Sequence, residues 1–378
     1  MLTDCHPPCK KGRAKRASSN QLPGRPQKLN PMNKFSIGVD LGGTNLRIAA
    51  VDEQGTLVEK VTLGARVSRG RDLVIVDMCD AIQGMANKFR GSAPMLGIGI
   101  GVPGIIDMRT GIVCESPNLQ DWVGYPARDV IEERLKTVVI FENDANVAAL
   151  GEQWLGAAKD FPDMAALTLG TGVGGGLVLG GSIWRGANGM AAEFGHTTVE
   201  ADGHPCGCGN RGCLEQYASA TAIVRMAQEA IAKNSKSALA AAANSDPEFS
   251  ARSIYNLAIQ GDEDARRIFR YVGRCLGIVL SAMVNSLNLP IYVIGGGVSS
   301  AWEAFSPAIF EELRRRSFVY AATAPYDASV VKEGASALTA AGSGPKTIIT
   351  RALLGSDAGL YGAARLPMIS PMISQARS

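Results

Sequence analysis

The stretch 192–216, which reads AEFGHTTVEADGHPCGCGNRGCLEQ, constrains the fold of this chain more than any other. It contains the pattern H-x9-C-x-C-x4-C, formed by His196, Cys206, Cys208 and Cys213. One imidazole and three thiolates suit tetrahedral Zn²⁺, and four protein ligands leave no open position on the metal. The pattern therefore predicts a structural zinc that holds a glycine-rich loop with too little apolar character to fold by itself.

Two alternatives to this ligand set stay open. The cysteines can instead be buried or disulfide-bonded, although the short Cys206-x-Cys208 spacing disfavours a disulfide within that pair, because bridging geometry is restrictive. His204 competes with His196 as the histidine ligand. We favour His196 because Glu193 and Glu215 then flank the metal, and two carboxylates there can bind hydroxyl groups.

The length and charge of the chain bound its class. Its 378 residues indicate a globular protein with two domains. The net charge is +3, but residues 1–32 hold seven of the basic side chains and one acidic one, so the remainder carries 31 basic against 34 acidic residues. A nearly neutral body argues against nucleic-acid binding. We interpret residues 1–32 as a disordered basic leader, which lacks the apolar segment of a signal peptide and whose Cys5, His6 and Cys9 we regard as incidental.

An uncharged run over residues 275–302 resembles a membrane span. Polar residues, Pro290 and three glycines interrupt it, so we predict a buried helix ending near Leu287, a strand at Ile291–Ile294 and a glycine turn. No other segment approaches the length of a membrane span. Eight cysteines without a secretory signal indicate a reducing cytoplasm, so we expect a cytoplasmic protein with no membrane partner.

A glycine turn, DLGGTN, follows the first apolar strand, which begins at Phe35, and a second strand leaves it through Ile48–Val51. Glycines let backbone amides approach an anion, the next two side chains add donors, and an aspartate at the strand end can hold Mg²⁺. The turn therefore suits a polyphosphate, although many hairpins look alike. The residues with these predicted roles are Asp40, Gly42, Gly43, Thr44 and Asn45.

Two more glycine clusters lie further along the chain. Residues 165–179 again read as strand, turn and strand, with Gly170, Thr171 and Gly172 in the turn. Gly295, Gly296 and Gly297 follow the strand at Ile291–Ile294, where a tight strand-to-helix turn is the simpler interpretation. The repetition predicts two related half-structures that face one cleft and hold a nucleotide between them.

A carboxylate follows another strand, at Val138–Phe141, where Glu142-Asn143-Asp144 leads into a helix. Asp144 thus lies at the carboxyl end of a strand and the N-terminus of a helix, where ligands bind in open α/β folds. Capping the helix is an alternative role for this residue.

The motifs DLGGTN, VPGIID, ENDANVAALGE, LGTGVGGG, EFGH and CGCGNRGCLE, in this order, resemble the ROK family of sugar kinases and related repressors, and most closely its bacterial glucokinases. The resemblance covers residues 35–366. It implies an α/β protein with the ribonuclease H-like (actin-like ATPase) fold, in which two α/β domains flank an active-site cleft. It also implies ATP-dependent phosphorylation of glucose to glucose 6-phosphate, Mg²⁺ bound with ATP, structural Zn²⁺ and a homodimer.

The resemblance assigns a role to each motif. Asp144 becomes the general base that takes the proton of the sugar 6-hydroxyl. The predicted sugar-binding residues are Asn118, Asn143, Asp144, Glu193, His196 and Glu215. Residues 40–45 and 170–172 would hold the phosphates, and 295–297 the adenosine. We expect a small N-terminal domain of residues 34–147 plus 352–366, a large domain of 148–350 with the zinc loop, and a tail of 367–378.

Two features depart from the family pattern. The leader is too short and too proline-rich for the winged helix-turn-helix of the repressors, which makes a sugar-sensing transcriptional regulator the minor alternative. The stretch 320–345 is rich in alanine and glycine, and we interpret it as a surface elaboration. A kinase for another hexose, such as N-acetylmannosamine, allose or fructose, and a polyphosphate-using glucokinase are the alternatives among enzymes.

Overall fold

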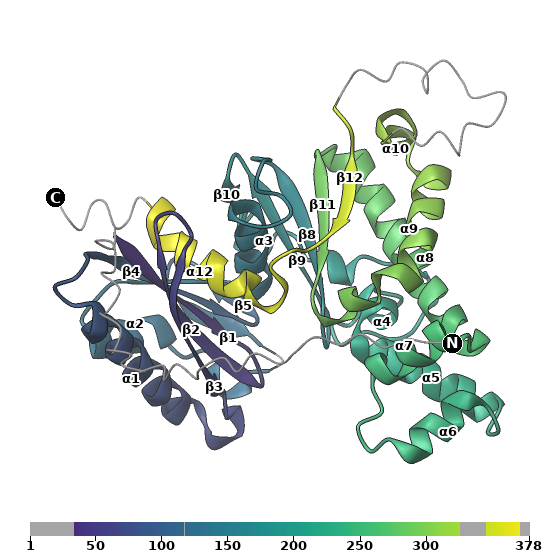
Figure 1. The fold of residues 1–378 in the computed structure, drawn as a ribbon, viewed down its shortest axis with the longest axis horizontal. Helices are drawn as coiled ribbons and strands as arrows, with labels where there is room; N and C mark the ends of the chain where they lie inside the picture. Colours follow the sequence, from purple (N-terminus) through teal and green to yellow (C-terminus); the bar gives the residue numbers. More distant parts are fainter. Residues whose placement is uncertain (1–33, 117, 326–344, 371–378) are drawn as a thin grey trace, which may run out of the picture.

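The computed structural model describes residues 34–116, 118–325 and 345–370, and two five-stranded sheets organise them (Figure 1). The first sheet has the order β3-β2-β1-β4-β7, and the second has the order β10-β9-β8-β11-β12. The strands of the first are β1 (Phe35–Leu41), β2 (Asn45–Asp52), β3 (Leu57–Gly64), β4 (Met95–Val102) and β7 (Val139–Asn143). Those of the second are β8 (Met164–Leu169), β9 (Val173–Leu179), β10 (Ser182–Ile183), β11 (Ile291–Gly295) and β12 (Ile348–Arg351).

The two sheets repeat one topology. In each, the first three strands of the sheet along the chain pair antiparallel in succession. The fourth strand then pairs in parallel with the first, and the fifth pairs in parallel with the fourth. The strands with helices on both faces are apolar along their whole length, as in β11, where every residue is buried. The prediction of two related half-structures is confirmed.

Helices cover the outer faces of both sheets (Figure 1). On the first sheet these are α1 (Arg71–Phe89) and α2 (Ala127–Leu135), with a small hairpin of β5 (Ile105–Asp107) and β6 (Ile112–Glu115). Beside the second are α4 (Glu215–Ala218), α5 (Ala220–Lys233), α6 (Ala238–Ser245), α7 (Ala251–Gln260), α8 (Glu263–Leu287), α9 (Trp302–Arg316) and α10 (Phe318–Thr323). The cysteine-rich loop lies between β10 and α4.

Helix α8 is the segment that resembles a membrane span. It is the one candidate by length and composition among the described residues, and 67% of its most apolar window is buried in the protein. It begins where Asp262 accepts a hydrogen bond from the Ala265 N–H at 2.8 Å, and it ends at Asn288, whose φ of 47° is left-handed. The predictions of a buried helix ending near Leu287 and of the strand after it are confirmed.

Two helices, α3 (Asp144–Trp154) and α12 (Ala358–Ile369), pack against each other between the sheets (Figure 1). Helix α12 lies on β1 and β4, and α3 lies on β8 and β9. Glycines allow this contact: a Cβ added to Gly362 would lie 1.7 Å from the Val147 carbonyl oxygen, and one on Gly151 would lie 2.1 Å from that of Ala358.

The packing of α3 and α12 concerns the predicted division into two domains, although it does not test the boundaries of that division. The C-terminal helix lies on the first sheet, as the family resemblance implies, but α3 crosses to the second sheet, so the division at residue 147 stays a prediction. The predicted leader, residues 371–378 of the predicted tail and most of the 320–345 stretch lie outside the described residues.

Candidate active site and metal centre

Asp144 is the first residue of α3, directly after β7. It is partly buried, and its Oδ1 atom accepts a hydrogen bond from the Ala145 N–H at 2.9 Å. Burial raises the pKa of this carboxyl to about 7, and the nearby carboxylates of Asp40 and Glu193 act in the same direction. A carboxyl that exchanges its proton near neutral pH is suited to acid–base chemistry.

The cap of this helix is Asn143, the residue before Asp144. Its side-chain oxygen accepts from the N–H groups of Ala145 (2.9 Å) and Asn146 (3.1 Å), and its amide nitrogen donates to the Gly104 carbonyl at 3.0 Å. One N–H of that amide remains for a ligand, so the sugar-binding role of Asn143 stays a prediction. Because Asn143 caps α3, Asp144 is not needed for that purpose.

A cavity of ≈ 180 Å³ lies between α3, α12 and the second sheet, and both Asp144 and Asp40 line it. Asp40 pairs with Arg47, whose Nη1 atom lies 3.0 Å from Oδ2 of the carboxylate. Burial nevertheless raises the pKa of Asp40, because it outweighs the opposing effect of Arg47. The other polar or glycine residues that line the cavity are Glu152, Thr168, Gly295, Gly296, Gly355, Ser356 and Gly359.

The three predicted glycine turns all end strands. Gly43 and Thr44 are exposed between β1 and β2, and a Cβ on Gly43 would lie 3.8 Å from the side-chain Cγ of the exposed Asn118. Gly296 has a φ of 82°, and a Cβ there would lie 2.4 Å from the carbonyl oxygen of Leu169. Leu169 directly precedes the turn at 170–172, so the second and third glycine clusters are neighbours, as a single nucleotide site requires.

Glu215 lies against the second glycine turn. Its Oε2 atom accepts from the Val173 N–H at 3.0 Å, and a Cβ on Gly172 would lie 2.4 Å from that same oxygen. The glycine therefore leaves room for the carboxylate. This contact joins a predicted sugar-binding residue to a predicted phosphate turn, which the sequence did not suggest.

Glu193 and His196 lie at the start of the cysteine-rich loop. Oε2 of Glu193 and Nε2 of His196 are 4.0 Å apart. Burial raises the pKa of Glu193, the imidazole of His196 opposes that change, and Glu215 and Glu115 add to it. The predicted sugar-binding carboxylates therefore share one electrostatic environment.

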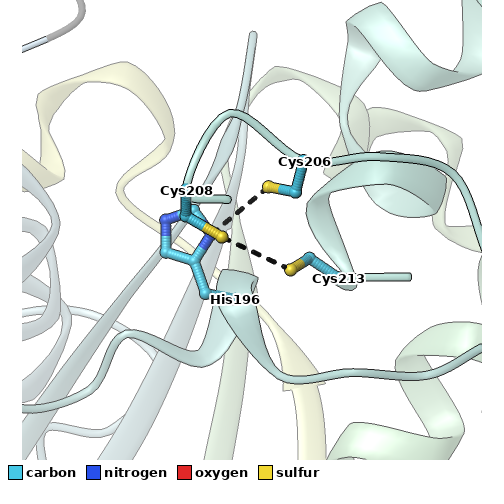
Figure 2. A group of neighbouring side chains, drawn as sticks. All are labelled: His196, Cys206, Cys208 and Cys213. Carbon is cyan, nitrogen blue, oxygen red and sulfur yellow. Dashed lines mark hydrogen bonds between the residues drawn. The ribbon is translucent and has the colours of Figure 1, made fainter. Parts of the chain in front are cut away.

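The four predicted metal ligands lie together, with all donor atoms within 4.8 Å of one another (Figure 2). Cys208 Sγ and Cys213 Sγ are 3.7 Å apart, and so are Cys206 Sγ and His196 Nδ1. Tetrahedral ligands at the usual Zn–S length of about 2.3 Å would be roughly 3.8 Å apart. The donor set therefore fits a closed tetrahedral site. His204 is outside this group, and its Nδ1 atom lies 2.9 Å from the Pro205 carbonyl oxygen instead.

The site includes residues that the sequence analysis did not single out. Glu152 is 2% exposed and accepts from the N–H groups of Ala157 (2.8 Å), Leu353 (3.1 Å) and Leu354 (2.8 Å), which holds the segment before α12. Glu115 adds to the charge around Glu193. Glu152 ends the motif ENDANVAALGE and Glu115 lies outside the quoted motifs, and in neither case does the sequence reveal that the side chain turns inward.

Three features together define an actin-like α/β protein of the sugar-kinase type: the repeated sheet, the two helices between the halves, and the cavity lined by carboxylates and the Gly295–Gly296 turn. The ROK family model matches residues 36–368. The "Glucokinase" of Thermotoga maritima is 40% identical over 284 residues, which are 75% of this chain and 87% of that protein. A "Xylose repressor" of Caldicellulosiruptor bescii is 31% identical over 284 residues, which are 75% of this chain and 71% of that protein.

The crystal structure of a ROK family glucokinase from Streptomyces griseus in complex with glucose and AMPPNP is also similar. It has a TM-score of 0.68 and 34% identity, and the match covers 87% of this chain and 98% of that one. This chain belongs to the ROK family. The resemblance and the fold class inferred from the motifs are confirmed.

Proposed function

We propose that this protein transfers the γ-phosphoryl group of ATP to the 6-hydroxyl of glucose, which yields glucose 6-phosphate and ADP. Asp144 is the observation that carries the proposal. It is a carboxyl with a pKa raised to about 7, in a cavity shared with Asp40 and the Gly295–Gly296 turn. The 40% identity to a glucokinase, and the bound glucose and ATP analogue in the similar crystal structure, favour these substrates.

In this proposal Asp144 takes the proton of the attacking hydroxyl. Phosphoryl transfer needs little covalent chemistry from the protein, since positioning and charge neutralisation supply most of the rate. A base whose pKa is near the working pH is deprotonated in a large share of the molecules and still binds the substrate's proton strongly enough to assist the transfer. The new O–P bond forms at the sugar oxygen as the bond from the γ-phosphorus to ADP breaks.

The glycine turns would hold the donor. Backbone N–H groups at 42–45 and 170–172 are candidates for the phosphates, and 295–297 for the adenosine. Asp40 would hold Mg²⁺, which neutralises phosphate charge when bound with ATP. The acceptor would lie next to the first two turns, where Glu193, Glu215, His196, Asn118 and Asn143 offer acceptors and donors for adjacent hydroxyls.

We further infer that the cysteine cluster binds Zn²⁺ as a structural ion. Coordination through Nδ1 of His196 would leave Nε2, which faces Glu193, free for a sugar oxygen, so that the metal orients a sugar contact. Thiolate ligands fit a reducing cytoplasm. We expect a homodimer from the family pattern, and light scattering at several protein concentrations tests it.

A panel of hexoses tests the substrate proposal. Purified protein is assayed with glucose, N-acetylmannosamine, allose and fructose, each with ATP-Mg²⁺ and with polyphosphate. We expect the highest kcat/KM for glucose with ATP. A higher value for another pair would correct the substrate. If no pair gave turnover above the Asp144→Asn protein while the chain bound a sugar, the kinase assignment would fail in favour of a sugar sensor.

A further inference from the structure

An ion pair outside the proposed catalytic group joins the two sheets. Glu142 is the next-to-last residue of β7 in the first sheet, and it is 1% exposed. Its Oε2 atom lies 2.6 Å from the Nε atom of Arg185, which follows β10 in the second sheet. A buried carboxylate without a partner is strongly unfavourable, so the ion pair with this arginine stabilises Glu142 in its present place.

The other oxygen of Glu142 organises the residues around the predicted base. Oε1 accepts from the Asn143 backbone N–H and from the Asn146 side-chain nitrogen, both at 3.0 Å. An ionised carboxylate only accepts hydrogen bonds, so Asn146 has to turn its NH₂ group toward it. The amide oxygen of Asn146 is thereby buried with no hydrogen-bond partner among the described residues. The bond to Glu142 thus sets the orientation of the Asn146 amide even though it leaves the amide oxygen without a partner.

Arg185 begins a short loop that ends at the predicted sugar site. The Ala191 N–H donates to the Arg185 carbonyl at 3.2 Å and closes the loop. Gly189 in this loop lies against the first half of the molecule, where a Cβ on it would be 3.1 Å from the Ile106 carbonyl oxygen. The next residue after the closure, Ala192, has a left-handed φ of 68°, and Glu193 follows it.

We propose that Arg185 is a positioning residue for the phosphoryl transfer. Its ion pair with Glu142 keeps the loop that leads from β10 to Glu193 in register with the end of β7, where Asn143 leads into Asp144. The side chain of Arg185 donates to Glu142 and not to Asp144 or to a predicted sugar-binding residue of the described chain. The inference rests on the proposed function, because its readout is hexose turnover. Misplacement of reacting groups by about 1 Å can cost 10²-fold in rate, so a loose register should be visible in kcat.

Four variants test the inference: Arg185→Met, Arg185→Lys, Glu142→Gln and the double variant Glu142→Gln/Arg185→Met. For each we measure kcat and KM for glucose and for ATP, together with the melting temperature. The control is Arg109→Met, which removes an exposed arginine paired with Asp107 at 3.6 Å in the turn of the β5–β6 hairpin. Wild-type turnover is measured in parallel, so that its absence counts against the proposed function rather than against this inference.

We expect Arg185→Met to lower kcat about 10- to 100-fold, with the KM for ATP changed less than threefold and the melting temperature reduced. Arg185→Lys should restore at least half of that loss on a logarithmic scale. The double variant should recover the melting temperature, since no unpaired carboxylate is buried, and yet keep the low kcat, since the loop is no longer held.

An ion pair with only a structural role would give a double variant with normal kcat. That outcome, or full activity in folded Arg185→Met, would overturn the inference. If Arg185→Met does not fold, the double variant alone decides.

Discussion

Replacement of Asp144 by asparagine tests the proposed mechanism most directly, because the change keeps the size of the side chain and removes its ability to accept a proton. Asparagine can still accept from the Ala145 N–H, and Asn143 continues to cap the helix, so the start of α3 should remain intact. General-base assistance is typically worth on the order of 10²–10⁴-fold in rate, which is about 3 to 5 kcal/mol. We therefore expect kcat to fall by at least 10² while the glucose Kd changes severalfold at most.

The same substitution has a stability effect whose sign follows from the pKa. The carboxyl has an ordinary value of 3.8, and the fold raises it to about 7, so the folded state binds a proton more tightly than the unfolded state does. The folded protein therefore loses stability as the pH rises from about 4 to 7. Each pKa step is worth 1.36 kcal/mol, which gives an upper bound on the order of 4 kcal/mol above pH 7. Asparagine carries no such cost, so Asp144→Asn should be more stable than wild type at pH 8 and nearly equal to it at pH 4.

The assay pairs steady-state kinetics with denaturant unfolding between pH 4 and 8, in buffer without nucleotide or Mg²⁺ for the unfolding. The kcat/KM of the wild type should rise toward neutral pH with an apparent pKa near 7, and this acid limb should be absent in the variant. A matched control is Asp163→Asn, which removes a surface carboxylate that accepts from the Gly180 N–H. A kcat loss below tenfold would refute the catalytic role, and a variant less stable than wild type at pH 8 would refute the electrostatic reasoning.

Three other predictions follow from the site. Cys208→Ser should lose the stoichiometric zinc and raise the glucose KM. Cys114→Ser, which alters an exposed thiol outside the cluster, should keep the zinc and the wild-type KM. Elemental analysis that finds no bound zinc in the wild type would contradict this prediction. Glu215→Gln should weaken glucose binding in calorimetry and spare ATP, because glutamine still accepts from the Val173 N–H, whereas Glu215→Ala should weaken both; equal effects of the two variants on ATP would count against the contact. Ala192→Val should lower the free energy of unfolding by at least about 1–2 kcal/mol more than Ala192→Gly, because a β-branched residue adopts the left-handed φ of 68° poorly, and equal urea midpoints would disprove this.

The sequence predicted the strands and turns of this protein well, for a physical reason. A short apolar run that ends in a glycine cluster usually forms a buried strand that enters a tight turn. The segments 35–52, 164–179 and 291–297 all follow that pattern. The two glutamates near the cysteine motif, Glu193 and Glu215, favoured His196 over His204 as the metal ligand, and the structure brings His196 to the cysteines. Patterns of this kind depend on residues close together in the sequence, so they can be interpreted without knowledge of the fold.

What the sequence did not predict depends on contacts between distant segments. Glu142 and Arg185 are 43 positions apart, and Glu152 contacts a segment about 200 positions away. Neither glutamate differs by pattern from a surface carboxylate on a helix or strand. The cap is a similar case: both Asn143 and Asp144 are good N-cap residues, and only the backbone geometry assigns that position to Asn143.

The packing of the two central helices explains how two carboxylates can share one cavity. Asp144 opens α3, and Asp40 lies against the first turn of α12, where a Cβ on Gly359 would be 3.3 Å from its carboxylate. Both acids therefore lie at the positive ends of helix dipoles, which partly offsets their mutual repulsion and their burial. The distance between those helix ends depends on the contact of Gly362 with the Val147 carbonyl, which no larger residue permits. A side chain there would separate α3 from α12 and hence the proposed base from the proposed Mg²⁺ ligand, although it lies outside the cavity itself.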